Sequence, residues 1–271
     1  MKFLGFRRPD GKVGIRNHVL VLATVGCAAE AARQTADGIY GAVSFINQNG
    51  CGESSRNLPR TQDVLVGMAA NPNVYGVVAI GLGCEMNRMD GFIKELRART
   101  DKPIEGLLIQ EEGGTIETVA KAKKIARRMV IEASMCRREE CDISELMLGI
   151  ECGGSDATSG LVSNPVMGII SDRIIAAGCQ LIVFTTGRGN AIGSSVAPVM
   201  KVTANGDTAR KLSDNIDLDM SAVLEEGVSL DAMADITMQQ ILDTLSGRLT
   251  SAETLKLGYS EAVISRACEY C

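Results

Sequence analysis

The sequence predicts an α/β protein with a mostly parallel sheet, helices on both faces and a smaller α-rich C-terminal part. First, it has short apolar runs without polar alternation, which are typical of strands covered on both faces. Second, helix-length stretches separate these runs, and strand–helix–strand alternation favours right-handed βαβ units. Third, 29 glycines against six prolines indicate many tight turns.

The elements follow in order along the chain. The expected strands are the apolar runs 19–25, 42–46, 74–80, 104–109, 146–150 and 181–184, with a short candidate at 199–202. The expected helices are 28–39, 58–70, 89–100, 115–134 and 161–177, then 233–247 and 252–257. The polar stretch 135–142 is the best boundary, so we expect an N-terminal α/β domain over 1–141. A second α/β region with anion-binding loops and C-terminal helices is expected over 142–271.

Composition excludes several classes of protein. The 271 residues suffice for one large or two small domains with a sizeable core. Lys and Arg number 28 against 33 Asp and Glu, a net charge of −5, which argues against nucleic-acid binding and basic membrane-surface modules. No apolar run is long enough for a membrane span, and the start lacks a signal-peptide core. We therefore expect a cytoplasmic protein that binds neither nucleic acid nor membrane.

Nine cysteines in a cytoplasmic chain are expected to stay reduced and to serve as ligands, nucleophiles or core residues. The single histidine, His18, makes Ser-His-Asp chemistry and multi-histidine zinc sites hard to build, and its place at a strand entrance favours a structural role. Cys136 and Cys141 are expected to be exposed, and the C-x-x-C of Cys268 and Cys271 is weak support for zinc.

Four cysteines follow expected strands in the same way, in the turn that leads to the next helix: Cys27, Cys51, Cys84 and Cys152. In open α/β sheets ligands bind beyond the carboxyl ends of the strands, so neighbouring parallel strands would bring the thiols to one edge. One interpretation is a thiolate-rich metal or iron–sulfur site. The alternatives are small core residues in glycine turns, or a reactive thiol at a helix start.

Three glycine-rich stretches are candidate anion-binding loops, because turns at helix starts present backbone N–H groups. Residues 151–160 combine small residues, hydroxyls and two carboxylates. Residues 185–195 contain Arg188, which could pair bidentately with a carboxylate; their weak dinucleotide fingerprint is discounted because Pro198 follows at once. Residues 110–115 are either a third anion or metal loop or an ordinary solvated helix start.

Several blocks together resemble the altronate and galactarate dehydratase family, in its large subunit or main region, which includes the (2R)-sulfolactate sulfo-lyase large subunit. The blocks are residues 5–17 (GFRRPDGKVGIRN), 49–52 (NGCG), 71–74 (NPNV), 81–85 (GLGCE), 151–156 (ECGGSD), 184–190 (FTTGRGN) and 214–217 (DNID). The resemblance spans nearly the whole chain. It implies a lyase that removes water or sulfite from a hydroxylated or sulfonated acid to give a 2-keto product.

The resemblance also implies a metal and a set of site residues. The cofactor would be iron or another divalent metal, with an iron–sulfur cluster as an alternative, held around Cys27, Cys51, Cys84 and Cys152. Glu85, Glu151 or Asp156 would supply a ligand or base, since a base must remove the proton next to the carboxylate. The acid would be held by Gly153, Gly154, Ser155, Thr186, Arg188 and Asn190. Expected partners are the small acid, a small SAF-domain subunit and further copies of the chain.

Two departures from the family pattern leave an alternative open. Asn47 stands where the family often has a histidine before the Asn-Gly-Cys-Gly turn. Residues 177–180 join the helix before them directly to the next strand, where family members usually have a long segment. The alternative is therefore a shortened, non-catalytic relative that binds a ligand or partner. An NAD(P)-linked oxidoreductase is a remote third possibility.

Overall fold

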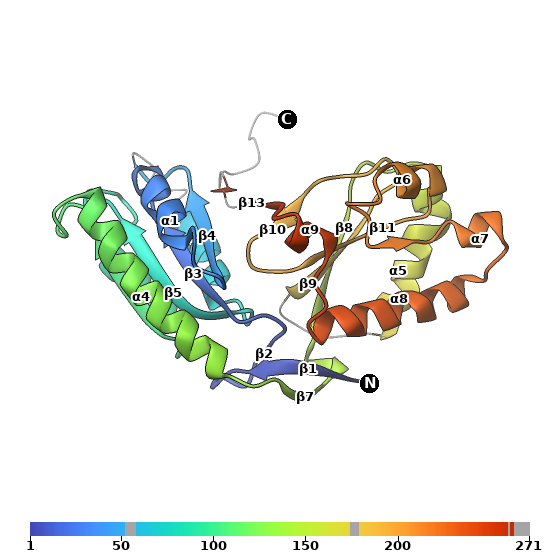
Figure 1. The fold of residues 1–271 in the computed structure, drawn as a ribbon, viewed down its shortest axis with the longest axis horizontal. Coiled ribbons are helices and arrows are strands. Elements are labelled where there is room, and N and C mark those ends of the chain that lie inside the picture. Colours follow the sequence, from blue (N-terminus) through green and yellow to red (C-terminus); the bar gives the residue numbers. More distant parts are fainter. Residues whose placement is uncertain (52–57, 174–178, 260, 263–271) are drawn as a thin grey trace. The chain divides into compact units, whose positions relative to one another are not determined.

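A computed structural model describes residues 1–51, 58–173, 179–259 and 261–262 (Figure 1). These residues form two compact units. Unit 1 contains Met1–Arg7, Lys12–Arg16 and Arg138–Gly258; unit 2 contains Arg8–Gly11, Asn17–Arg137 and the described residues after Gly258. Within the described part of the chain, no helix has the length and apolar character needed to cross a membrane.

Unit 2 is built on a five-stranded parallel sheet in the order β14-β4-β3-β5-β6. The strands are β3 (His18–Ala23), β4 (Ala42–Asn47), β5 (Val74–Gly81), β6 (Ile104–Leu108) and β14 (Glu261–Ala262). The chain runs from β3 outward to β4 and returns to β5 on the other side of β3. That reversal of strand order is where ligands bind in doubly wound sheets, beyond the carboxyl ends of the strands.

Helices cover both faces of this sheet. On one face, α1 (Ala29–Ala36), which follows the 3₁₀ turn η1 (Gly26–Ala28), packs against α4 (Thr115–Met135) and β3 (Figure 1). Elsewhere α2 (Leu58–Ala70) and α3 (Met89–Arg97) pack together and against β5 and β6 respectively. Val21 belongs to the cluster under α1 and α4, yet the alternate residue Leu22 is also 0% exposed. Coverage of both faces explains why the run is apolar without alternation.

Unit 1 contains a second parallel sheet in the order β12-β11-β9-β8. Its strands are β8 (Met147–Cys152), β9 (Cys179–Thr185), β11 (Val199–Thr203) and β12 (Leu218–Asp219). The helices are the π-helix η3 (Ser159–Ser163), α5 (Asn164–Arg173), α6 (Gly206–Lys211), α7 (Ala222–Glu225), α8 (Leu230–Leu245) and α9 (Ser251–Thr254). α5 packs against α8, and their apolar residues bury one face of the sheet. The short strands β10 (Gly193–Ser194) and β13 (Gly258–Tyr259) pair with each other.

An antiparallel ribbon in unit 1 was not expected from the sequence. It has the order β2-β1-β7, from β1 (Lys2–Arg7), β2 (Val13–Gly14) and β7 (Glu139–Asp142), with the 3₁₀ turn η2 (Ile143–Glu145) after it. Phe3 lies opposite Cys141, and both are buried in the unit 1 core. The expectation that Cys141 is an exposed thiol is therefore wrong, because its alternate position on β7 points it into the core; Cys136 is exposed, as expected.

The α/β class and most expected elements are confirmed. Each expected strand is present within a few residues of its expected limits, and expected helix 58–70 has the same limits as α2. The parallel strands, however, belong to two separate sheets rather than one. Residues 174–178, which include the end of expected helix 161–177 and the start of the join at 177–180, lie outside the described residues, as do Cys268 and Cys271.

Candidate functional site

Two neighbouring loops in unit 1 contain most of the predicted site residues. β8 ends at Cys152 and β9 at Thr185, and these parallel strands are adjacent with Cys152 opposite Thr185. The loops that follow therefore leave the same edge of the sheet. They carry Glu151, Cys152, Gly153, Gly154, Ser155 and Asp156 after or at the end of β8, and Thr186, Arg188 and Asn190 after β9.

The two loops pack so closely that glycine is needed at the contacts. A Cβ atom on Gly153 would lie 2.9 Å from Cζ of the Phe184 ring. Gly154 has a φ of +63°, and a Cβ there would lie 3.3 Å from the Thr186 hydroxyl. On Gly187 a Cβ would overlap the Asp156 carboxyl group. Any side chain at these positions would push the loops apart.

Several loop amides are used by the fold and not offered to an anion. The Gly153 N–H donates to the Thr185 carbonyl at 3.2 Å, and the N–H groups of Gly187 and Arg188 both donate to the Gly154 carbonyl, at 3.1 and 2.9 Å. The Arg188 side chain is exposed. Anion binding here therefore depends on the Arg188 guanidinium more than on those amides, in contrast to the expectation of bare backbone donors.

Asp156 connects the loop after β8 to the start of α6. Its Oδ1 accepts hydrogen bonds from the Thr158 N–H at 2.9 Å and hydroxyl at 2.6 Å, and from the Ser159 N–H at 3.2 Å. Its Oδ2 accepts from Asn205 Nδ2 at 2.8 Å, while Asn205 Oδ1 caps α6 by accepting from the Thr208 N–H at 3.2 Å. Burial raises the pKa of Asp156, but these hydrogen bonds outweigh burial, so its pKa is lowered. A carboxylate held by four donors is suited to positioning the loops rather than accepting a proton.

Glu151 and Cys152 are the exposed functional groups at the end of β8. The Cys152 thiol lies 3.0 Å from the Ser155 hydroxyl. Hydrogen bonding by Ser155, followed by that of Thr185, lowers the pKa of Cys152 against the smaller opposing effect of burial. A lowered pKa favours the thiolate, and a thiolate can act as a nucleophile or a metal ligand.

Three of the four strand-end cysteines follow neighbouring strands at the corresponding edge of the unit 2 sheet. Cys27, Cys51 and Cys84 are exposed and follow β3, β4 and β5, which are neighbours in the sheet. Cys152 does not belong to this edge, because β8 lies in the separate sheet of unit 1. The assumption that all four thiols leave one sheet is therefore wrong.

Glu85 is a buried residue that holds part of unit 2 together through hydrogen bonds. The residue is only 6% exposed. Oε1 accepts from the Thr24 hydroxyl at 3.1 Å and the Leu82 N–H at 3.2 Å, and Oε2 accepts from the Gly83 N–H at 2.7 Å. These bonds tie the turn after β5 to the end of β3. A catalytic role for Glu85 stays a prediction, and its contacts favour a structural role.

Asn47 takes a similar connecting position between β4 and β3. It is 0% exposed, its Nδ2 donates to the Thr24 carbonyl at 3.0 Å, and its Oδ1 accepts from the Asn49 N–H at 3.2 Å. The Asn47 side chain thus makes two structural hydrogen bonds at the position where the family often has a histidine.

No group of three or more His, Cys, Asp or Glu side chains that could hold a metal ion is present among the residues that the structure describes. The donor types suit a soft metal, but their arrangement does not form a ready ligand set. The metal site stays a prediction. In the third candidate loop, Glu112 pairs with Lys121 of α4 at 2.6 Å, in keeping with an ordinary helix start.

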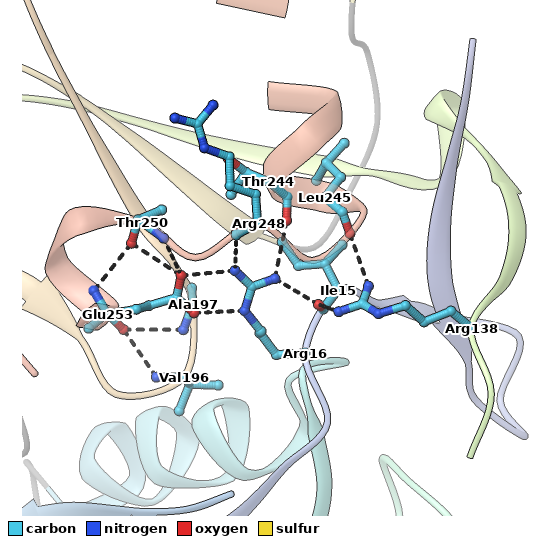
Figure 2. A network of polar contacts seen from close by, with 11 residues as sticks. Ile15, Arg16, Arg138, Val196, Ala197, Thr244, Leu245, Arg248, Thr250 and Glu253 are labelled. Atoms are coloured by element: carbon cyan, nitrogen blue, oxygen red, sulfur yellow. Dashed lines mark hydrogen bonds and ion pairs between the residues drawn. The ribbon is translucent and has the colours of Figure 1, made fainter. Parts of the chain in front are cut away.

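Three polar residues of unit 1 were not predicted as site residues. Asn205 follows β11 as the predicted residues follow β8 and β9, so the strand-end rule could have found it. Arg16 is 6% exposed and pairs with Glu253 of α9, as Figure 2 shows; its position in the family-like N-terminal block was the only signal. Lys201 is a lysine inside the apolar run of β11 and was not singled out.

Models of two domains of one enzyme family match the chain. The model "D-galactarate dehydratase/Altronate hydrolase, second domain" matches residues 5–134. The model "D-galactarate/Altronate dehydratase, C-terminal" matches residues 143–178 and 173–269, two pieces that meet where the sequence predicts a missing segment.

Curated relatives agree with these models. The chain is 28% identical to the (2R)-sulfolactate sulfo-lyase subunit beta of Chromohalobacter salexigens, with 98% of each chain covered. It is 34% identical to the altronate dehydratase of Escherichia coli K12 over 64% of this chain and 36% of the relative. It is 33% identical to the galactarate dehydratase (L-threo-forming) of the same organism over 42% and 23%. The chain thus spans about a third or less of these two dehydratases.

The comparison with the sulfo-lyase subunit also gives the least number of alignment positions that this chain lacks. The alignment extends over 386 positions, whereas this chain has 271 residues. At least 115 positions (386 minus 271) therefore have no counterpart in this chain, although nearly all of both chains is covered.

Proposed function

Because the chain belongs to the D-galactarate and altronate dehydratase family, we propose that it is a lyase that eliminates water, or sulfite, from a small hydroxylated or sulfonated carboxylic acid. Altronate, galactarate and sulfolactate, the acids in the relatives' names, are the first candidates. The product would be a 2-keto acid. We further expect the reaction to take place in the cytoplasm.

The main support for this proposal is that the loops after β8 and β9 in unit 1 are held in fixed positions. The Asp156–Asn205 hydrogen bond at 2.8 Å and the glycine contacts of Gly153 and Gly187 fix both loops in place. Rigid positioning of substrate groups is a main source of rate enhancement. The fixed loops hold Glu151, Ser155 and Arg188 at the exposed edge of the sheet.

Each exposed group has a proposed role. The Arg188 guanidinium binds the carboxylate of the acid, and the exposed Ser155 and half-buried Asn190 complete the contacts. Thr186 is 0% exposed and its hydroxyl accepts from the Gly189 N–H at 3.0 Å, so it supports the loop. The Glu151 carboxylate serves as a proton carrier at the open end of the site. Asp156 positions the loop after β8 through its hydrogen bonds. Glu85 positions the turn after β5 in unit 2 in the same way.

Metal dependence is a separate part of the proposal. The family resemblance leads us to expect iron or another divalent metal, with Cys27, Cys51 and Cys84 as the first ligands to test. When bound, such an ion would supply Lewis-acid chemistry. Anaerobic purification, elemental analysis and a visible spectrum separate a cluster, a single metal ion and an empty site.

The test is turnover of the three acids under anaerobic conditions, with Fe²⁺ supplied, followed by the appearance of 2-keto acid or sulfite. Arg188→Lys is the matched variant, since it keeps the charge but loses the bidentate geometry. We expect the KM of this variant to rise by about tenfold or more, the effect of about 1.4 kcal/mol. Absence of product from all three acids with wild-type protein would refute the lyase.

A second candidate is a shortened, non-catalytic relative that binds a partner. Two observations support it: at least 115 positions of the sulfo-lyase subunit are missing here, and Asn47 is committed to structural hydrogen bonds. One relative is named as a subunit beta, and we propose that this chain also binds a small SAF-type subunit and copies of itself. Size-exclusion chromatography with a full-length homologue tests this; a chain that stays monomeric would count against it.

A further inference from the structure

Helix α4 of unit 2 is strongly basic in a chain whose net charge is −5. Its Lys121–Arg128 segment contains five exposed cationic side chains and no carboxylate. Two of them pair with carboxylates of unit 2, at 2.6 Å to Glu112 and 3.3 Å to Glu105. Three make no ion pair with any residue that the structure describes: Lys123, Lys124 and Arg127. Their spacing places these three on one side of the helix, and together they form the basic face of α4.

Large apolar side chains extend the basic face of α4 toward both ends of the helix. Ile116 is 83% exposed, Ile131 is 56% exposed and Met135 is 78% exposed. Ile131 follows Arg127 by four residues and Met135 follows Ile131 by four, so they lie on the same side of the helix as the cations. Covering such side chains with a partner removes apolar surface from water, which is favourable. The face therefore combines charge with apolar area.

Helix α8 of unit 1 has the opposite charge on its outer side. It contains no lysine or arginine, and its three carboxylates are exposed at spacings of four and eight residues: Asp231, Asp235 and Asp243. These three form the acidic face of α8. Ile236, which is 49% exposed, lies next to Asp235. The inner side of the helix is buried in the unit 1 core.

Stability of α8 alone does not explain this acidic face. A carboxylate in the first turn of a helix is favoured by the helix dipole, which accounts for Asp231. Asp243 lies in the last turn, where the dipole favours cations instead. Nor does α8 offer these carboxylates a lysine or arginine one turn away, because it has none. The acidic face is therefore suited to a basic partner from outside the helix.

The two faces match in spacing as well as in charge. Lys123 and Arg127 are four residues apart, and so are Asp231 and Asp235. Four residues of α-helix rise by about 6 Å, so both pairs can meet when the helices lie side by side. Helices that cross at about 20° stay in contact along their length. With 21 residues in α4 and 16 in α8, both helices extend beyond the charged pairs and bring their exposed isoleucines into the contact.

We propose that the basic face of α4 docks on the acidic face of α8 in a second copy of this chain. In a pair of copies with two-fold symmetry this contact occurs twice, because α4 of each copy meets α8 of the other. The ion pairs orient the two copies, and the apolar side chains add area. The proposal names the surface for the association of copies proposed above, and it does not depend on the lyase reaction.

Sedimentation equilibrium of the full chain and its charge-reversed variants, across the micromolar range, tests the contact. Wild type is expected to exceed the 28.7 kDa of a single chain. One variant reverses the basic face of α4 (Lys123→Glu with Arg127→Glu), and the other reverses the acidic face of α8 (Asp231→Lys with Asp235→Lys). Each variant alone places like charges opposite each other, so its dissociation constant is expected to rise by about tenfold or more.

An equal mixture of the two variants distinguishes this contact from any other. In a mixed pair the reversed α4 of one variant meets the reversed α8 of the other, and the unchanged α8 meets the unchanged α4. Both contacts then regain opposite charges, so the mixture is expected to associate within about threefold of the wild-type dissociation constant. A contact between the two helices of one chain cannot be restored by mixing.

Lys94→Glu with Arg97→Glu is the matched control, since both cations are exposed on α3 and the net charge changes as it does in the α4 variant. It is expected to associate as wild type does, and thermal melting followed by circular dichroism checks that every variant is folded. A monomeric wild type would overturn the proposal, and so would a mixture that stays dissociated. An α3 control as weak as the α4 variant would overturn it too, by showing that net charge alone acts. Failure to convert any acid would overturn the proposed lyase and leave this contact in place.

Discussion

Arg16 donates two hydrogen bonds to the carboxylate of Glu253, from Nε to Oε1 at 2.7 Å and from Nη2 to Oε2 at 2.8 Å (Figure 2). The same guanidinium donates to the Thr244 carbonyl at 3.1 Å, in the last turn of α8, and to the Arg248 carbonyl at 2.9 Å. Cations at a helix C-terminus stabilise its unpaired carbonyls. Arg16 therefore connects the N-terminal segment of unit 1 to both α8 and α9.

Replacing Arg16 by methionine is expected to lower the free energy of unfolding by about 3 kcal/mol, because it leaves the largely buried Glu253 carboxylate without its ion-pair partner and removes one donor from each of two carbonyls. Urea unfolding measures the change. Arg88→Met is the control, since its partner Asp90 and Arg88 itself are largely exposed, and it is expected to change stability by less than about 0.5 kcal/mol. Equal effects of the two variants would show that burial adds nothing to the Arg16 pair.

Stability is expected to fall in acid through Glu253. Burial raises the pKa of Glu253, but the hydrogen bonds and charge of Arg16 outweigh burial, so the pKa in the folded protein is lowered. The pair therefore stabilises the fold at pH above the unfolded pKa of about 4.3, and this stabilisation is lost as pH falls through the folded value. Urea midpoints between pH 7 and pH 3 should drop more steeply for wild type than for Glu253→Gln. Parallel slopes would contradict this assignment.

The loop contact between Gly187 and Asp156 can be tested with alanine. Gly187→Ala puts a methyl group into the Asp156 carboxyl and is expected to cost about 1–3 kcal/mol of stability and most of the lyase turnover. Gly160→Ala is the matched control, because no atom lies within 4 Å of its added Cβ. Unfolding midpoints and kcat measure both variants. A Gly187 variant as active as the Gly160 variant would show that the loops need no such closeness.

Much of this fold could be predicted from sequence because its signals are local. The apolar run before Thr24 predicts a strand buried on both faces, and β3 is one. The pairing of β1 with β7 could not be predicted, since Phe3 and Cys141 are distant in the chain and Gly5 weakens the strand pattern. Which sheet a strand joins is also a non-local property. For that reason the strand-end rule puts Cys152 at one edge with Cys27, Cys51 and Cys84, whereas the structure has it at the end of a strand in the other sheet.

The same local rule predicts the candidate site residues but not what their side chains contact. Asp156 and Glu85 follow strands, as candidate bases should, but their donors come from Asn205 and Thr24 on other strands. The burial of Lys201 could not be predicted, because lysine side chains usually lie at the surface. Only the strand register places it beside Phe184.

The Cys152 thiol is expected to react faster with iodoacetamide at neutral pH than it does in Ser155→Ala. The Ser155 hydroxyl lies 3.0 Å from Sγ and is the main cause of the lowered pKa of Cys152. Removing the hydroxyl raises the pKa, so less thiolate is present. Mass spectrometry of the peptide that contains Cys152 follows the rate, with the Cys136 peptide as internal control. Unchanged rates would show that Ser155 does not activate the thiol.

The most direct measurement for the whole account is anaerobic conversion of altronate, galactarate and sulfolactate by the purified chain, with Fe²⁺ present and absent. The account predicts a 2-keto acid from at least one of them, with a KM that is about tenfold or more higher in Arg188→Lys than in wild type. No 2-keto acid from any of the three acids, with folded wild-type protein and metal supplied, would contradict it.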